Sequence, residues 1–404
     1  MQMSSTSSLI AATSIACLLM PAARTQNHLL VPSQFPEIGL AIQSANPGDI
    51  IEVEERFPRY QPFVIDRPIT IVGRAGEHRA PTVLVFAGVG IDIQLAPGER
   101  ATLSRIDVQS DATAVATGGM RIQGGAVTLE DCRIVSGNDP SGQAAAVEAT
   151  DTELNVTFCR FAGGAGGTGL LANNSFISLT DSRCGGGSMP SGAGLELRDS
   201  VLHATEGWLL GGDELLAAPG GDALRVLGNS LATLHESTAV GGSGQPAGSG
   251  LVNMTNEPVE HSVDTFAGGM SFPSLTFAPD IVGPATSNPN LVGLRWSEPP
   301  YRNGTLQPGL PWAANVYASP NVLGAVAFSF GPSGLAALIT RQAALLPGDI
   351  VLISAMVTGV TGFGTFSGTL PNDPGLRGAT LWAQAMAGTS FPMEASPPSA
   401  VVVR

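Results

Sequence analysis

The chain has 404 residues with a net charge of −14, 51 glycines and 30 prolines, and 43% of its residues are hydrophobic. All 19 of its basic residues are arginines, which excludes lysine chemistry. The acidic charge and the absence of a basic run disfavour nucleic acid as a partner, and the hydrophobic content indicates a folded chain with many turns.

The first 23 residues are typical of a secretory signal peptide. An apolar core at 9–20 is followed by Pro21 and the small residues Ala22 and Ala23, which predicts cleavage near Ala23. A membrane anchor is the alternative, but the core is shorter than the roughly 20 residues that a span needs. No later segment is apolar enough to cross a bilayer. We therefore expect a mature protein that is secreted, periplasmic or on the cell surface, with no membrane span.

A stretch of seven residues recurs six times from Thr102 onwards. The copies read TLSRIDV, TLEDCRI, NVTFCRF, SLTDSRC, HATEGWL and TLHESTA, and they start 26, 27, 23, 25 and 30 residues apart. A period in this range indicates stacked structural repeats.

The positions within the repeat predict two short strands joined by a bend. The second and seventh positions are apolar in every copy, and the fifth, which is mostly small, shares the inward face of a strand with the seventh. The fourth is acidic at Asp131, Asp181, Glu206 and Glu236, which suits a bend. A glycine-rich loop and a third short strand follow each copy, as in GMRI and GLEL. Three strands and three turns describe one coil of a parallel β-helix. A helical bundle is excluded because glycine interrupts the chain too often, and a β-sandwich with coincidental spacing is the remaining alternative.

The segment FPEIGLAIQSANPGDIIEV, followed by ITIVGRAG, resembles the opening of right-handed parallel β-helix proteins of the pectin-lyase-like superfamily. The resemblance covers about 35–270 and implies a fold, not an activity. It also implies a short amphipathic helix at 37–45, with Ile38, Ala41, Ile42 and Ala45 on one face. Such a helix covers the open end of the stack and keeps its edge from pairing with another chain.

The repeat fades at about residue 271, in a proline-rich stretch. Short alternating or apolar runs at 323–330, 349–355, 362–370 and 380–385 then predict an all-β, sandwich-like domain. The stretch LPNDPGLRGATLWAQAMA resembles a small domain that follows β-helices in uncharacterised secreted bacterial proteins. We therefore expect a signal peptide at 1–23, a β-helix at 27–270, a linker at 271–290 and a β-sandwich-like domain at 291–404.

The sequence carries no established catalytic motif. The NTD, DD and GHG motifs of polygalacturonases are absent, as are QDT and DFIFG of pectinesterases, HExxH and GxSxG. We expect no metal or cofactor, and single exposed histidines. Asp131 with Asp181, or Glu206 with Glu236, could supply the carboxylate pair of a glycoside hydrolase, but the repeated bend already accounts for these acids.

Cys132 and Cys159 occupy the same inward column on successive coils. Their separation would be about 4.8 Å, which is within the Cα range of a disulfide. Neighbouring parallel strands aim such side chains side by side, so we favour free, buried thiols.

The sixth repeat position lies between two inward positions and therefore faces outward. It is occupied by Asp107, Arg133, Arg160, Arg183, Trp208 and Thr238. Three like charges on consecutive coils repel one another unless something anionic compensates them.

One interpretation of this row is structural: Glu130, Asp131 and Asp181 pair with the arginines, or the arginine stems cover apolar surface. The other is a shallow groove in which the guanidinium groups bind carboxylates or sulfates of a polysaccharide while the tryptophan stacks on a sugar ring. The predicted binding residues are therefore Arg133, Arg160, Arg183 and Trp208.

These observations favour a secreted, non-catalytic β-helix protein that binds an anionic polysaccharide or an envelope component, or has an extracellular structural or adhesive role. The alternative is a polysaccharide lyase or glycoside hydrolase with a non-standard site on the β-helix face. A third hypothesis, a purely structural spacer, predicts that every outward arginine is already paired.

Overall fold

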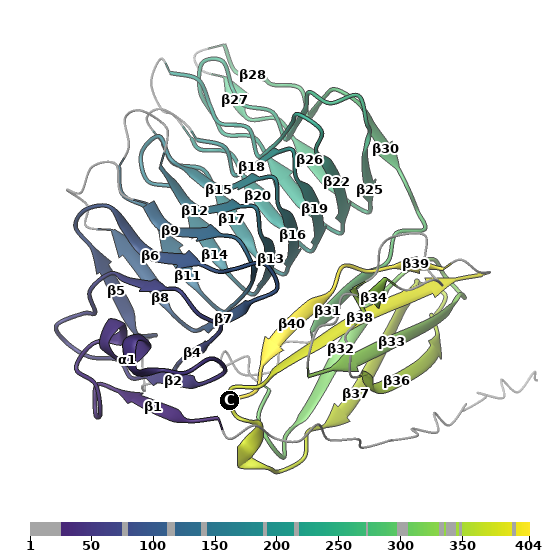
Figure 1. Cartoon of the computed structure of the whole chain (residues 1–404). Coiled ribbons are helices and arrows are strands. Elements are labelled where there is room, and N and C mark those ends of the chain that lie inside the picture. Colours follow the sequence, from purple (N-terminus) through teal and green to yellow (C-terminus); the bar gives the residue numbers. More distant parts are fainter. Residues whose placement is uncertain are drawn as a thin grey trace, which may run out of the picture.

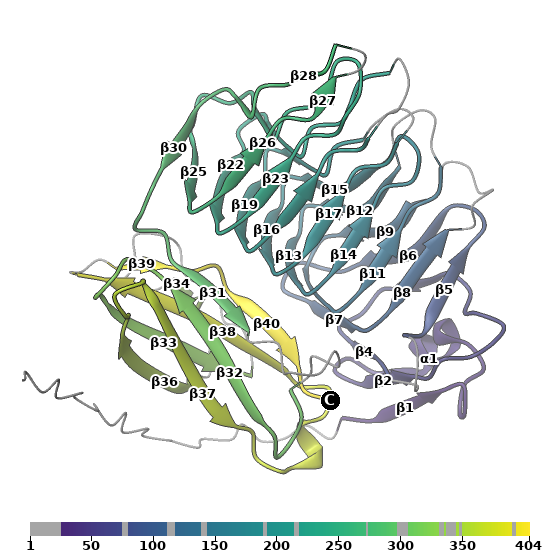
Figure 2. The ribbon, with the colours of Figure 1, turned by 180° about the vertical axis from the view of Figure 1, so that it is seen from behind.

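A computed structural model of the chain shows a long stack of parallel strands beside a smaller antiparallel β-domain (Figure 1; Figure 2 from behind). It describes residues 26–74, 80–110, 118–138, 144–188, 192–213, 218–271, 274–296, 306–330, 335–336, 345–346, 350–389 and 393–404. The predicted signal peptide lies outside these ranges. Within them, no helix is long and apolar enough to cross a membrane.

The stack consists of three parallel sheets, here called A, B and C, which successive coils of the chain extend strand by strand. Sheet A contains β1 (His28–Val31), β2 (Ile50–Val53), β4 (Thr70–Gly73), β7 (Arg100–Ser104), β10 (Ala126–Glu130), β13 (Glu153–Thr157), β16 (Phe176–Thr180), β19 (Val201–Thr205), β22 (Leu231–His235), β25 (Val259–Ser262) and β30 (Ala285–Ser287). Sheet B contains β5 (Thr82–Val85), β8 (Asp107–Ser110), β11 (Arg133–Val135), β14 (Arg160–Ala162), β17 (Arg183–Gly185), β20 (Trp208–Leu210), β23 (Thr238–Val240) and β26 (Thr265–Ala267). Sheet C contains β3 (Phe63–Ile65), β6 (Val89–Gln94), β9 (Gly118–Gln123), β12 (Ala145–Thr150), β15 (Thr168–Asn173), β18 (Leu195–Arg198), β21 (Leu224–Leu227), β24 (Leu251–Asn253) and β29 (Ile281–Val282). The predicted parallel β-helix is confirmed.

Each copy of the seven-residue repeat spans the end of a sheet A strand, a bend and the start of a sheet B strand. Leu129 and Ile134, at the second and seventh positions, are buried in the core, as are their equivalents in the other copies. The fourth residue has a positive φ in all six copies, namely Arg105, Asp131, Phe158, Asp181, Glu206 and Glu236. This left-handed conformation turns the chain between the two sheets, where the sequence predicts a bend.

The fifth repeat position forms a ladder of hydrogen bonds beneath this bend. The backbone N–H of Cys159 donates to Ser182 Oγ at 2.9 Å, and that of Cys132 donates to Cys159 Sγ at 3.4 Å. The N–H of Gly207 likewise donates to Ser237 Oγ at 3.0 Å. These side chains satisfy buried backbone donors at the bend. The three described cysteines are free and buried, and Cys159 serves as an acceptor, not as half of a disulfide.

The glycine-rich segments between sheets B and C are hydrogen-bonded to one another. In the coil after β17, the N–H of Gly192 donates to Gly187 O at 2.8 Å, and the N–H of Gly212 in the next coil donates to Gly192 O at 3.0 Å. A Cβ on Gly212 would lie 1.9 Å from Gly187 O, so no larger residue fits. In these predicted loops, the backbones of successive coils therefore pack directly against one another, and this close approach requires glycine.

Helix α1 (Ile38–Ser44) covers the first coil of the stack. Its buried residues Ile38, Ala41 and Ile42 belong to the hydrophobic core of the β-helix, and the helix contacts β1, β2 and β3. The predicted capping helix is confirmed.

The C-terminal domain is built from antiparallel strands. One sheet contains β31 (Gly293–Trp296), β32 (Pro311–Tyr317) and β37 (Phe363–Thr369), and the other contains β36 (Ile350–Val357), β33 (Leu323–Ser329), β38 (Thr380–Gly388), β39 (Glu394–Ala395) and β40 (Ser399–Val402). The short elements of this domain are the pair β34 (Leu335–Ala336) with β35 (Leu345–Leu346) and the 3₁₀ helix η1 (Pro374–Leu376), whereas the antiparallel pair β27 (Met270–Ser271) with β28 (Thr276–Phe277) lies at the far end of the stack (Figure 1). Trp296 and Trp312 pack against Phe328 in a core that residues of both sheets share, with ring centroids 6.0 and 4.7 Å from that of Phe328. The sandwich-like architecture is confirmed.

This domain packs on the outward face of sheet A, where β40 contacts β10, β13 and β16. Asn155 Nδ2 and Ser178 Oγ both donate to Pro398 O at 2.7 Å. Arg404 forms an ion pair with Glu130 at 3.2 Å, and Glu130 is fully buried. The polar outward residues of sheet A are therefore interface residues.

The segment 271–290, predicted as a linker, contributes strands to the stack. Strand β29 pairs in parallel with β24, and β30 pairs in parallel with β25. The boundaries at 27–270 and 291–404 otherwise stay a prediction.

Candidate functional site

The outward row predicted from the repeat lies at the first position of four neighbouring sheet B strands. Arg133 pairs in register with Arg160, Arg160 with Arg183, and Arg183 with Trp208. All four side chains are exposed, and Trp208 exposes 53% of its surface. Neighbouring strands lie about 4.8 Å apart, so the three guanidinium groups follow the axis of the stack at short intervals. We call these four residues the Arg–Trp row.

The three arginines form no hydrogen bond or ion pair with any part of the chain that the structure describes. The acids proposed as their partners are engaged elsewhere: Glu130 with Arg404, Asp131 with Arg105 at 3.5 Å and with Arg404 at 3.6 Å. Asp181 forms an ion pair with an arginine of the C-terminal domain, Arg295, at 3.0 Å. These acids therefore form their ion pairs with other arginines, although Arg160 lies close enough to Asp131 to oppose the rise in the pKa of Asp131 that burial causes. That the arginine stems cover apolar surface stays a prediction.

One acid continues the row at its start. Asp107 lies opposite Arg133 in register. Burial raises the pKa of its carboxyl to about 6, and Arg133 opposes that rise. The net positive charge of this part of the row therefore increases as the pH falls through about 6.

A second outward row runs beside the first, two residues further along each strand. Its members on the central strands are small or apolar, namely Val135, Ala162, Gly185, Leu210 and Val240. Side chains two apart on a strand share a face, so this strip leaves room beside the longer side chains of the Arg–Trp row. The face combines cationic donors, one exposed aromatic ring and a low apolar strip.

A cluster of titratable groups lies at the bend column where the C-terminal domain meets the stack. Arg295 bridges Asp181 and Glu206, and the Tyr317 hydroxyl also bonds to Glu206. Burial and the neighbouring Glu206 raise the pKa of Glu236, and burial raises the pKa of Tyr317 to about 12. The sequence brings the acids together through the repeat, but no local pattern links them to Arg295 and Tyr317.

The expectation of single exposed histidines is wrong for three of the four described histidines, since His261 is half-buried against Phe266 and His203 and His235 are covered. His203 and His235 lie on the outward face of sheet A and line a small cavity beneath Leu291 and Val292 of the following segment. Burial lowers the pKa of each imidazole to about 4. Across the described residues, no group of three or more His, Cys, Asp or Glu side chains is arranged to hold a metal ion.

No protein-family model and no curated protein matches the chain. Among solved structures, the chain is similar to full-length tailspike protein 2 from an Escherichia coli O157:H7 bacteriophage, with 10% identity and a TM-score of 0.30 over 97% of this chain and 70% of that one. It is also similar to the enzymatically active domain of tailspike protein 2 of bacteriophage CBA120, with 11% identity and a TM-score of 0.32 over 89% of this chain and 66% of that one. At these values the function has to be argued from the chain's own residues.

Proposed function

We propose that this chain is an extracellular β-helix protein that binds an anionic polysaccharide through the Arg–Trp row without cleaving it. The observation that carries the proposal is the exposed, in-register row of three arginines without an ion-pair partner among the described residues, followed by Trp208. A linear polymer and a β-helix both repeat along a line, so successive acidic groups can meet successive guanidinium groups.

The electrostatics of the row support an anionic ligand. The protein as a whole is acidic, with a net charge of −14, yet this row concentrates three positive charges. Their mutual repulsion falls when carboxylates or sulfates lie between them, and guanidinium groups bind such oxyanions with paired hydrogen bonds. Trp208 supplies an apolar ring face for a sugar, and the low strip at Ala162 and Gly185 leaves space for the polysaccharide to lie against the sheet.

The secreted location and the family are part of the same proposal. The apolar segment at 9–20 supports export, and the opening segment with its capping helix supports membership of the pectin-lyase-like superfamily. The resemblance of the C-terminal domain to domains of secreted bacterial proteins supports an envelope or matrix setting.

The test is retention on immobilised anionic polysaccharides, namely pectate, alginate and a sulfated glycan. The double variant Arg160→Ala/Trp208→Ala should lose about tenfold or more in affinity, since it removes one charged hydrogen-bonding group and the stacking ring. Retention of the wild type should also fall with added salt.

The matched control is Arg198→Ala/Phe277→Ala, which removes one exposed arginine and one exposed aromatic ring elsewhere, on β18 and β28. It should be retained like the wild type. Equal retention of the Arg160→Ala/Trp208→Ala variant and the wild type would rule the row out as the binding site.

A glycoside hydrolase or lyase is the second candidate, supported by the cluster at the bend column. The pKa of Glu236, raised by burial and by the neighbouring Glu206, is the property that a general acid needs. Release of reducing ends or unsaturated products from these glycans, abolished in Glu236→Gln, would favour the enzyme over the binder. No release at high protein concentration would leave the non-catalytic binder as the better account.

A further inference from the structure

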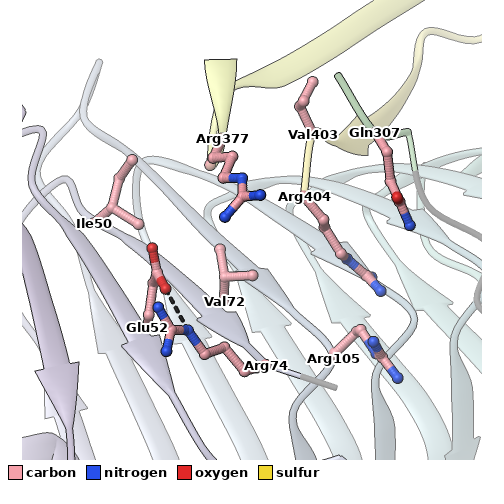
Figure 3. A pocket seen from close by; sticks show the side chains of 11 residues that line it. Ile50, Glu52, Val72, Arg74, Arg105, Gln307, Arg377, Val403 and Arg404 are labelled. Atoms are coloured by element: carbon pink, nitrogen blue, oxygen red, sulfur yellow. Dashed lines mark hydrogen bonds and ion pairs between the residues drawn. The ribbon is translucent and has the colours of Figure 1, made fainter. Parts of the chain in front are cut away.

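A pocket of about 200 Å³ lies between the first coils of the β-helix and the C-terminal domain (Figure 3). Its apolar lining comes from Ile50 and Val72 of sheet A and from Val403 of the C-terminal domain. Its charged lining is dominated by arginine: Arg74, Arg105, Arg377 and Arg404 line it, against the single acid Glu52. We call this space the arginine pocket.

The four arginines differ in how far the protein satisfies them. Arg74 forms an ion pair with Glu52 (Figure 3). It also pairs with Glu54 at 2.8 Å. Arg377, which enters from the C-terminal domain, is exposed and forms no side-chain hydrogen bond or ion pair with the described residues. The mouth of the pocket therefore contains one engaged and one unengaged guanidinium group.

The inner pair is more deeply buried and only partly satisfied: Arg404 Nη2 donates to Ser104 Oγ at 2.8 Å and pairs with Glu130, and Arg105 pairs with Asp131 at 3.5 Å. The side chains of Arg404 and Arg105 are 9% and 14% exposed, and burial together with the nearby Arg404 lowers the pKa of Arg105. Arg404 Nε and Nη1 are buried without a hydrogen-bond partner, although Asp131 lies 3.6 Å from Nη1. Buried charged donors without partners are costly, and an oxyanion is the group that satisfies guanidinium N–H groups best.

We propose that the arginine pocket binds an oxyanion group, such as a sulfate or the carboxylate of an acidic sugar, between Arg105, Arg377 and Arg404. The site is separate from the Arg–Trp row and goes beyond the function proposed above. Because Arg105 comes from the β-helix and the other two arginines come from the C-terminal domain, the bound anion also holds the two parts together.

The test is calorimetric titration of the full chain with sodium sulfate and, separately, with galacturonate, at constant ionic strength set by chloride. We expect saturable binding of at least one of the two, and an affinity about tenfold lower in Arg377→Gln. Binding of sulfate alone supports a site for a free inorganic anion, and binding of galacturonate supports a site for a saccharide acid. Since Arg377 is exposed and unpaired, the variant should unfold like the wild type in the absence of ligand.

Arg198→Gln is the matched control, because it removes an exposed arginine of sheet C outside the pocket and should titrate like the wild type. Arg105→Gln provides a second variant from the β-helix side and should also weaken binding. The proposal is overturned if neither anion binds saturably, or if Arg377→Gln and Arg105→Gln bind as tightly as the wild type. Polysaccharide retention through the Arg–Trp row should be unchanged in Arg377→Gln, so the two proposals fail independently.

Discussion

Sheets A and B come from the same coils and present outward rows of side chains in the same regular register. The outward side chains of sheet A are covered by the C-terminal domain, whereas those of sheet B are exposed. On sheet A, Glu130, Asn155 and Ser178 meet Arg404 and Pro398 of the C-terminal domain and become buried. On sheet B, the arginines at the start of β11, β14 and β17 remain exposed without such partners among the described residues. An outward polar row on a β-helix therefore has no fixed role, because the element that covers it decides between structure and binding.

The largest expected difference between the two sheets is in stability. Arg404→Ala leaves the fully buried Glu130 without its cation, and breaking a buried pair in this way costs about 3 kcal/mol. Arg160→Ala should change the free energy of unfolding by less than about 0.5 kcal/mol, because its side chain is exposed and unpaired. Urea unfolding of both variants measures the contrast. Equal losses would mean that the sheet B row is as structural as sheet A.

Acid should weaken the covered sheet before the open one. His203 and His235 have pKa values of about 4 when covered and about 6.5 when exposed, so the uncovered state binds more protons between these values. The stabilisation from neutral imidazoles is complete above about pH 6.5 and is lost as the pH falls towards 4, by roughly 2 kcal/mol per histidine at pH 5. Hydrogen exchange, expressed as protection relative to an unfolded chain at the same pH, should show lower protection of β19 and β22 at pH 5 than at pH 7. Identical pH dependence in a His203→Gln/His235→Gln variant would contradict this origin.

The smallest expected effect concerns the open sheet. Protonation of Asp107, whose pKa is about 6, removes one negative charge opposite Arg133. Binding of a sulfated polysaccharide, which keeps its charge in this range, should therefore be roughly threefold tighter at pH 5 than at pH 7.5. Asp107→Asn should bind equally well at both values. A pH effect that persists in Asp107→Asn would have another source.

The periodic features of the fold follow from the sequence alone. Leu129 and Ile134 recur as inward residues because each coil must bury its inner face against the next, and Asp131 and its equivalents mark the bend because the same turn recurs. The register of Arg133, Arg160, Arg183 and Trp208 could be predicted for the same reason: alternation along a strand fixes which side chains face out. The capping helix and the all-β C-terminal domain are likewise local patterns.

Only the tertiary structure determines which outward side chains are paired or covered. Arg295, Arg377 and Arg404 lie far along the chain from the acids and arginines that they approach, and no local pattern links them to the β-helix. The docking of the C-terminal domain brings Arg404 to Asp131 and Arg295 to Asp181, covers His203 and His235 of sheet A, and forms the arginine pocket. Long-range packing creates these contacts, in which arginines of the C-terminal domain balance the charges of acids on the β-helix. The repeat encodes only the relation of each coil to the next.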